Sequence, residues 1–280
     1  MAFDVHQAVT DRIIAALEND ASETWTCPWH RTGGALPRNA VTGKAYRGIN
    51  VLSLWVGAQA AGYTDDRWAT YKQWAEMGAQ VRKGERSTLV VFFKDLSPGE
   101  ADADERPRFV ARGSYAFNAA QVDGAPGLDG SEPASAWHLP ESFDRFVADT
   151  GAEVLHGGDA AFYQPTADRI VMPPRERFHT AHGYASTMCH ELTHWTGAPT
   201  RLARDLSGRF RSQSYAAEEL VAELGAAFLM AEMGLAPEPH PTHASYIASW
   251  LKLLRDDSRA IFTAAGAASK AAQYLADMRD

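Results

Sequence analysis

The chain has 280 residues, of which 45% are hydrophobic and 22% charged, the balance of an ordinary soluble globular protein. This composition excludes disorder along the whole chain, and no apolar run approaches the roughly 18 residues that a membrane span requires. Residues 1–20 mix acids with apolar residues and do not resemble a secretory signal. There are two cysteines, Cys27 and Cys189, so a disulfide framework is not indicated. We therefore expect a cytoplasmic protein with no membrane partner.

The net charge of −8 is unevenly distributed. Residues 25–94 carry ten basic and four acidic side chains, a net charge of +6, whereas the rest of the chain carries −14. Such an asymmetry suggests different partners for the two parts of the chain. Chance variation of surface charge explains it equally well when charge is considered alone.

The first half mixes helical and strand patterns. Asp65 or Asp66 is the expected cap of one helix, which Gly78 terminates. In chain order we predict a helix at 3–19, loops with short strands at 23–50, helices at 49–61 and 66–77, and strands at 87–94 and 109–118. Together these elements predict a small α+β domain at 1–124.

A stretch rich in Gly and Pro at 125–136 is the expected linker to a second domain at 137–280. Its patterns are mainly helical. We predict helices at 143–150, 180–196, 215–233, 243–256 and 258–275, and a strand or hairpin at 160–172. The predicted fold class is therefore α+β with two domains, the second being mainly helical with a small sheet.

The helix predicted at 180–196 contains the motif H-E-x-x-H at residues 190–194. Positions i and i+4 lie one turn apart on one helix face, so His190 and His194 can reach the same zinc ion. Glu191 lies beside them, where it can accept a proton from a metal-bound water. The alternative is a core helix whose two histidines make ordinary hydrogen bonds.

A catalytic zinc site normally has three protein ligands and an open position, so a third ligand is expected downstream. The helix at 215–233 offers Glu218, Glu219 and Glu223. Glu219 and Glu223 share a face, and the pair resembles the gluzincin arrangement, in which one acid binds zinc and the other supports a ligand histidine. We therefore predict that Glu219 is the third metal ligand and that Glu223 accepts a hydrogen bond from the free N–H of a ligand histidine. Glu218 is the alternative ligand.

This assignment predicts a hydrolytic mechanism. Zinc lowers the pKa of its water toward ~7, Glu191 takes the proton, and zinc stabilises the oxyanion that follows attack on a carbonyl. A second electrophile usually helps, and Tyr215, His182 and Tyr184 are candidates that the sequence does not rank well. Cys189 points off the face of His190 and is interpreted as a small buried hydrophobe.

Aromatic side chains interleave with the bases of the first half. Stacking of bases on aromatics, with cations along the phosphates, is how proteins hold single strands without sequence preference. The residues at 44–48 and 81–85 have the composition of turns that present cations. The alternative is that the tryptophans form the core of a small domain, and we expect this for Trp55, Trp68 and Trp74.

Taken together, these residues resemble the ArdC-type antirestriction proteins of conjugative plasmids and phages, whose N-terminal domain is related to that of plasmid TraC primases. In the first half the resemblance rests on residues 42–50, 67–73, 81–85 and 117–122, and in the second on residues 190–197, 201–202 and 215–223. The resemblance implies a zincin-like metallopeptidase domain and binding of single-stranded DNA. The residues that we expect to contact DNA are Lys44, Tyr46, Arg47, Lys72, Arg82 and Lys83.

The family implies protection of incoming DNA against host restriction. The expected cofactor is zinc, with manganese or cobalt as alternatives, and the expected partners are single-stranded DNA and a host protein substrate. Two other hypotheses stay open. One is a DNA-binding protein with a structural or vestigial metal site, and the other is a peptidase whose first domain binds a protein.

Overall fold

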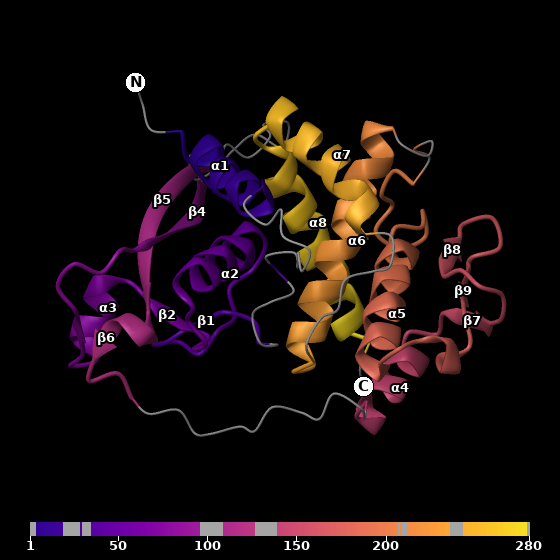
Figure 1. The fold of residues 1–280 in the computed structure, drawn as a ribbon, viewed down its shortest axis with the longest axis horizontal. Helices are drawn as coiled ribbons and strands as arrows, with labels where there is room; N and C mark the ends of the chain where they lie inside the picture. Colours follow the sequence, from indigo (N-terminus) through magenta and orange to yellow (C-terminus); the bar gives the residue numbers. More distant parts are fainter. Residues whose placement is uncertain are drawn as a thin grey trace, which may run out of the picture.

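The computed structural model describes residues 4–18, 29, 35–95, 109–126, 139–206, 208, 212–235 and 243–278. It confirms the predicted α+β class (Figure 1). The first half contains α1 (Val5–Glu18), β1 (Arg38–Asn39), α2 (Ile49–Ala61), β2 (Arg67–Ala69), α3 (Tyr71–Glu76), β3 (Gln80–Val81), β4 (Thr88–Asp95), β5 (Phe109–Asn118), a 3-10 turn (Ala119–Gln121) and β6 (Val122–Asp123). The second half contains α4 (Glu141–Asp149), β7 (Glu153–His156), β8 (Phe162–Gln164), β9 (Arg169–Met172), a 3-10 turn (Arg175–Arg177), α5 (Ala181–Thr196), α6 (Gln213–Glu232), α7 (His243–Asp256) and α8 (Ala260–Ala276).

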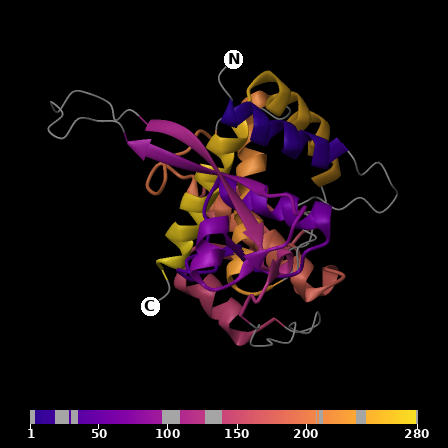
Figure 2. The same ribbon diagram turned by 90° about the vertical axis from the view of Figure 1, so that its left-hand side faces the viewer.

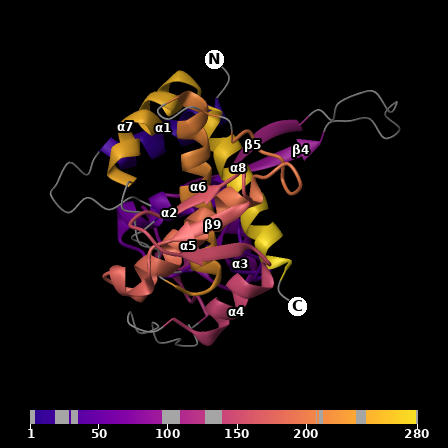
Figure 3. The same ribbon diagram turned by 90° about the vertical axis from the view of Figure 1, so that its right-hand side faces the viewer.

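The larger sheet has the strand order β1-β2-β5-β4, in which only β1 and β2 run parallel. Its edge strand β4 lies against α2, whose polar side chains bind the strand's outer backbone groups. Asn50 accepts a hydrogen bond from the Val91 amide at 2.7 Å and donates one to the Val91 carbonyl at 2.8 Å. Because an open edge invites pairing with another chain, these contacts close it where α2 lies. Beyond α2 the β4–β5 pair projects from the molecule (Figures 2 and 3).

The helix predicted at 66–77 is wrong in its first part. Residues 67–69 form β2, and α3 begins only at Tyr71. The cap is Thr70, whose side chain accepts a hydrogen bond from the Gln73 backbone amide at 3.2 Å, while the Thr70 backbone amide donates one to Oε1 of Gln73 at 3.0 Å. Asp65, one of the two predicted caps, instead binds Arg67 at 2.7 Å. Pairing of β2 with β1 and β5 therefore outweighs the helical pattern of its three residues.

The second half places a small sheet beside α5. The strand order is β7-β9-β8, with β7 parallel and β8 antiparallel to β9. The strand or hairpin predicted at 160–172 is a hairpin formed by β8 and β9, whereas β7 was not predicted. The remaining helices, α4 to α8, correspond to the five predicted ones.

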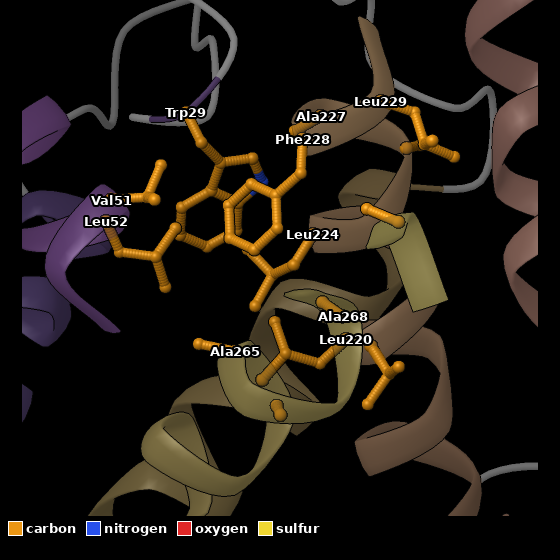
Figure 4. Packing of buried hydrophobic residues seen from close by; sticks show 14 of the residues in the cluster. Trp29, Val51, Leu52, Leu220, Leu224, Ala227, Phe228, Leu229, Ala265 and Ala268 are labelled. Atoms are coloured by element: carbon orange, nitrogen blue, oxygen red, sulfur yellow. The ribbon is translucent and has the colours of Figure 1, made fainter. Parts of the chain in front are cut away.

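One hydrophobic core joins the two halves. Val51 and Leu52 of α2 point toward Leu224 and Phe228 of α6 (Figure 4). A hydrogen bond also joins the halves, since the Gly48 amide donates to the Ser269 hydroxyl of α8 at 2.8 Å. The halves are thus held together by packing, an arrangement that the Gly- and Pro-rich residues 125–136 do not predict; most of that segment lies outside the described residues.

The three tryptophans expected in the core are buried there: Trp55, Trp68 and Trp74 are at most 3% exposed. Cys189 is fully buried, as its interpretation as a small hydrophobe predicts. No helix among the described residues has the length and apolarity needed to span a bilayer.

Candidate metal centre

α5 carries the H-E-x-x-H motif through the interior of the second half. The helix begins after Thr180, whose hydroxyl accepts a hydrogen bond from the Gly183 amide at 2.8 Å. His190 and Glu191 are each 3% exposed, and His194 is only slightly more open. A helix that is buried nearly all round is held in place by its neighbours, so its side chains have fixed positions.

α6 lies close against α5 because a glycine faces it. A Cβ atom added to Gly225 would lie 2.5 Å from the side chain of Thr193, far inside van der Waals contact. The absence of a side chain at Gly225 therefore sets how near the two helices approach. This approach places Glu218 and Glu219, about two turns earlier on α6, and Glu223, two residues earlier, beside the histidines of α5.

His190, His194 and Glu219 come together at the contact between the two helices. The Nε2 atoms of His190 and His194 are 3.2 Å apart. Each lies 3.6 Å from a carboxylate oxygen of Glu219. Ligand atoms that surround one zinc tetrahedrally at 2.0–2.1 Å lie about 3.3 Å from each other. The three groups therefore fit a divalent metal ion without rearrangement.

The Nδ1 atom of His190 faces Glu223, with 3.6 Å between the two groups. A carboxylate at this nitrogen fixes the orientation of the ring, so that Nε2 points to the place between His190, His194 and Glu219 where a metal ion fits. Burial by itself would lower the pKa of His190, but Glu219 and Glu223 outweigh it and raise this pKa to about 10. Burial likewise acts to raise the pKa of Glu219, and the two histidines lower it overall. The cluster thus holds a proton where a metal ion fits.

His194 has a different support. Its Nδ1 atom lies 3.1 Å from Glu218, and Glu218 in turn receives two hydrogen bonds from Arg204, at 3.0 and 2.8 Å. Arg204 also donates to the Thr193 carbonyl at 2.6 Å, which ties it to α5. Burial acts to raise the pKa of Glu218, but His194 and Arg204 lower it. From the sequence we expected Glu218 only as an alternative metal ligand, not as a support for His194. No sequence pattern pointed to Arg204, which lies in a loop.

A pocket of about 320 Å³ opens over the three ligand groups. Glu191 and Tyr215 line it together with His190 and His194. Burial is the largest cause of a raised Tyr215 pKa, followed by hydrogen bonding to Tyr246, whose hydroxyl is 3.0 Å away. Tyr215 therefore keeps its proton at neutral pH and can act as a hydrogen-bond donor in the pocket.

The other two candidate electrophiles lie elsewhere. Tyr184 accepts or donates a hydrogen bond with His156 at 2.9 Å and stacks under Arg175, in a separate hollow. His182 is buried on α5 and does not line the metal pocket.

One wall of the pocket belongs to β8, through Phe162 and Tyr163. Arg201 fixes this strand to the metal helix. It pairs with Asp168 in the turn after β8, and it donates to the Trp195 carbonyl of α5 at 2.6 Å while lying over the Trp195 ring. Arg201 therefore links this wall of the pocket to the helix that carries the ligand histidines.

The residues expected to contact DNA have unlike surroundings. Lys44 and Lys83 are exposed, and Lys72 is exposed on α3. Arg82 and Lys83 line one hollow. In contrast, Tyr46 is partly buried against the core, and Arg47 donates to Gln273 of α8 at 3.0 Å. The structure thus brings Arg82 and Lys83 together and directs Arg47 to the contact between the halves.

Comparison with known proteins accounts for both halves. A model of the N-terminal domain of the anti-restriction factor ArdC matches residues 3–122, and a model of zincin-like metallopeptidases matches residues 141–267. Protein y4eC of Sinorhizobium fredii is 45% identical over 97% of this chain and 91% of its own length. DNA primase TraC of Escherichia coli is 40% identical over 96% of this chain, which corresponds to only 27% of the primase.

Solved structures agree with these matches. The metal-free crystal structure of the antirestriction protein ArdC from plasmid R388 aligns with a TM-score of 0.84 at 41% identity, covering 99% of this chain and 98% of that one. The Mn(II)-bound structure of the same protein aligns with a TM-score of 0.81. With this fold, the matched domains and this metal-site geometry, the chain belongs to the ArdC family of antirestriction proteins.

Proposed function

We propose that this protein binds single-stranded DNA through its first half and hydrolyses peptide bonds at the centre on α5 and α6, and that it thereby protects incoming plasmid or phage DNA from host restriction. The observation that carries the hydrolytic part is the set of three ligand groups beside an open pocket that also contains Glu191. Structural zinc sites are usually closed by four protein ligands and need no general base. The site has the design of a catalytic centre.

His190, His194 and Glu219 would hold the metal ion. We propose zinc, and manganese is the alternative because the related R388 protein binds Mn(II). When bound, the ion acts as a Lewis acid and brings the pKa of a bound water near ~7. Glu191 accepts the proton of the attacking water, and Tyr215 donates a hydrogen bond to the oxyanion. Glu223 and Glu218 keep the two imidazoles oriented throughout.

The DNA-binding part rests on different support. The first half matches the ArdC N-terminal domain, and the whole chain resembles a segment of the primase TraC, a protein that acts on DNA. Residues 25–94 carry a net charge of +6 within an acidic chain. Cations along a surface favour the phosphates of a nucleic acid. We place the contacts at Lys44, Lys72, Arg82 and Lys83, with Arg47 at the border with α8.

The first experiment is elemental analysis of the purified protein beside four variants. We expect near-stoichiometric metal in the wild type and in Glu191→Gln, loss of metal in His194→Ala and Glu219→Ala, and weakened but measurable binding in Glu218→Ala. Hydrolysis of an unfolded protein such as casein should then be lost in Glu191→Gln although its metal is retained. A wild type that takes up no metal, even with added zinc, would remove the peptidase part.

Two further outcomes separate the remaining alternatives. If Glu191→Gln and the wild type both bind metal and neither cleaves any protein tested, the site is structural or vestigial. Contacts to phosphates release counterions, so binding to DNA is strongest at low salt. If the protein binds no oligonucleotide even at low salt, the alternative in which the first half binds a protein is favoured.

A further inference from the structure

The turn at 82–86, which links β3 to β4, separates two hollows of the first half. One hollow of about 540 Å³ is lined by Tyr71, Phe117, Arg82 and Lys83, among others. The second, of about 810 Å³, lies between α1 and α2 and is lined by Glu85 and Arg86 at its near end. Glu85 borders both hollows. The turn is therefore a ridge with a recess on each side.

Tyr71 presents an aromatic ring in the first hollow. It is the first residue of α3, directly after the Thr70 cap, and it is 53% exposed. The ring meets Phe117 edge-on, with 6.5 Å between centroids, and its hydroxyl accepts a hydrogen bond from Gln80 at 2.9 Å. These two contacts fix the ring while leaving more than half of it open. An ordered, exposed aromatic ring is the surface on which a nucleobase stacks.

The ridge offers cations that are not already engaged. Among the described residues, Lys83 and Arg86 form no ion pair, and the same holds for Arg12 of α1 in the second hollow. Arg82 is bound differently: it pairs with Glu85 at 2.9 Å and with Asp123 at 3.6 Å. Glu85 also accepts a hydrogen bond from the Gln121 side chain at 3.1 Å. Positive charge is therefore available along the ridge and into the second hollow.

We propose that a single strand of DNA crosses this ridge, with one base stacked on Tyr71, its flanking phosphates on Lys83 and Arg86, and the next nucleotides in the hollow between α1 and α2. The inference deepens the proposed function and rests on it. It adds a stacking residue, Tyr71, to the residues expected to contact DNA. Stacking needs a base whose face is open, so this site selects single strands over duplex. α3 and β6 lie at the end of the molecule opposite α5, so the strand leaves the metal pocket free (Figure 1).

The test is fluorescence anisotropy of a labelled oligothymidylate with the full-length protein. Tyr71→Ala should weaken binding by about ten-fold or more, and Tyr71→Phe should bind like the wild type, since only the ring is needed. Phe92→Ala is the matched control, because Phe92 is 51% exposed on β4 and lines neither hollow. An oligonucleotide with abasic positions should bind the wild type and Tyr71→Ala alike, and more weakly than oligothymidylate binds the wild type.

The phosphate contacts have their own readout. The double variant Lys83→Gln with Arg86→Gln should lower the slope of log affinity against log salt by about 1.4, from two lost contacts to a single strand. Wild-type affinity in Tyr71→Ala, together with equal affinity of the wild type for abasic and normal strands, overturns the stacking site and leaves the proposed function standing. No binding of any single strand by the wild type at low salt refutes the DNA-binding function itself.

Discussion

Arg204 and Glu218 form a two-pronged ion pair inside the protein, with Nε 3.0 Å from Oε2 and Nη2 2.8 Å from Oε1. Both side chains are almost enclosed, at 12% and 11% exposure, so solvent screens the pair only weakly. Through Glu218 the pair reaches the Nδ1 atom of His194. Arg204 thus positions His194, a predicted metal ligand, without itself contacting the place where the metal ion would bind.

The first prediction follows from this chain of contacts. Arg204→Ala should weaken metal binding by about 10- to 100-fold, the usual effect of removing an outer partner of a ligand histidine. Arg204→Lys should restore little, because an ammonium group cannot make the parallel bonds of the guanidinium. Competition with a chelating dye measures the affinity. Arg175→Ala is the control, since Arg175 pairs with Asp144 at the surface; equal affinity in a folded Arg204→Ala variant would refute the role.

The second prediction concerns protons. The metal-free protein holds His190 protonated up to a pKa of about 10, between Glu219 and Glu223. A metal ion binds only neutral imidazole, so binding at pH 8 should release about one proton. Calorimetry in buffers of different ionisation enthalpy counts this proton. The affinity for the metal ion should rise with pH up to about 10, the pKa of His190, and then level off because His190 is already neutral.

Glu223→Gln provides the comparison for that measurement. It removes one of the carboxylates that raise the pKa of His190, so this pKa falls and less proton is released at the same pH. Proton release equal to that of the wild type in this variant would show that Glu223 does not act on His190.

The third prediction tests the close contact of α5 and α6. Gly225→Ala brings a methyl group to 2.5 Å from Thr193 and must push the helices apart. We expect a loss of about 1–3 kcal/mol in the free energy of unfolding, and weaker metal binding because Glu219 moves with α6. Urea denaturation and the dye competition measure the two effects. Adding Thr193→Ala should restore part of both, a non-additivity expected of residues in contact.

The fourth prediction separates chemistry from metal binding. Tyr215→Phe removes the hydroxyl that lines the pocket, together with its hydrogen bond to Glu219, but keeps all three ligand side chains. We expect unchanged metal content with a peptidase rate lowered by about 10²–10³, the usual effect of losing one oxyanion donor. Tyr246→Phe, which keeps the Tyr215 hydroxyl, should have a smaller effect. A Tyr215→Phe rate equal to that of the wild type would remove Tyr215 from the mechanism.

The fifth prediction concerns the shared core. Phe228 of α6 packs against Trp55 of α2, with 5.7 Å between ring centroids. Phe228→Ala should cost about 3–5 kcal/mol of unfolding free energy. Because the contact joins both halves, tryptophan fluorescence and loss of bound metal should report one transition in the wild type. Two well-separated transitions would mean that the halves unfold independently despite the common core.

The sequence alone determined what depends on local spacing. An i, i+4 pair on a helix places His190 and His194 on one face in any fold, and the same rule pairs Glu219 with Glu223. Apolar periodicity located α2, β5 and α7 at their observed bounds. These patterns are decided by neighbours in the chain, so a single sequence is enough to find them.

Only the tertiary structure decided what depends on distant segments. Residues 67–69 became a strand because β1 and β5 lie on either side of them, not because of their own pattern. The approach at Gly225 chose which acid faces each histidine, giving Glu218 to His194 and Glu223 to His190. Arg204 enters the site from a loop, and packing of α2 on α6 joins the two halves. Such contacts carry no periodic signal, since they arise from side-chain packing between elements far apart in the chain.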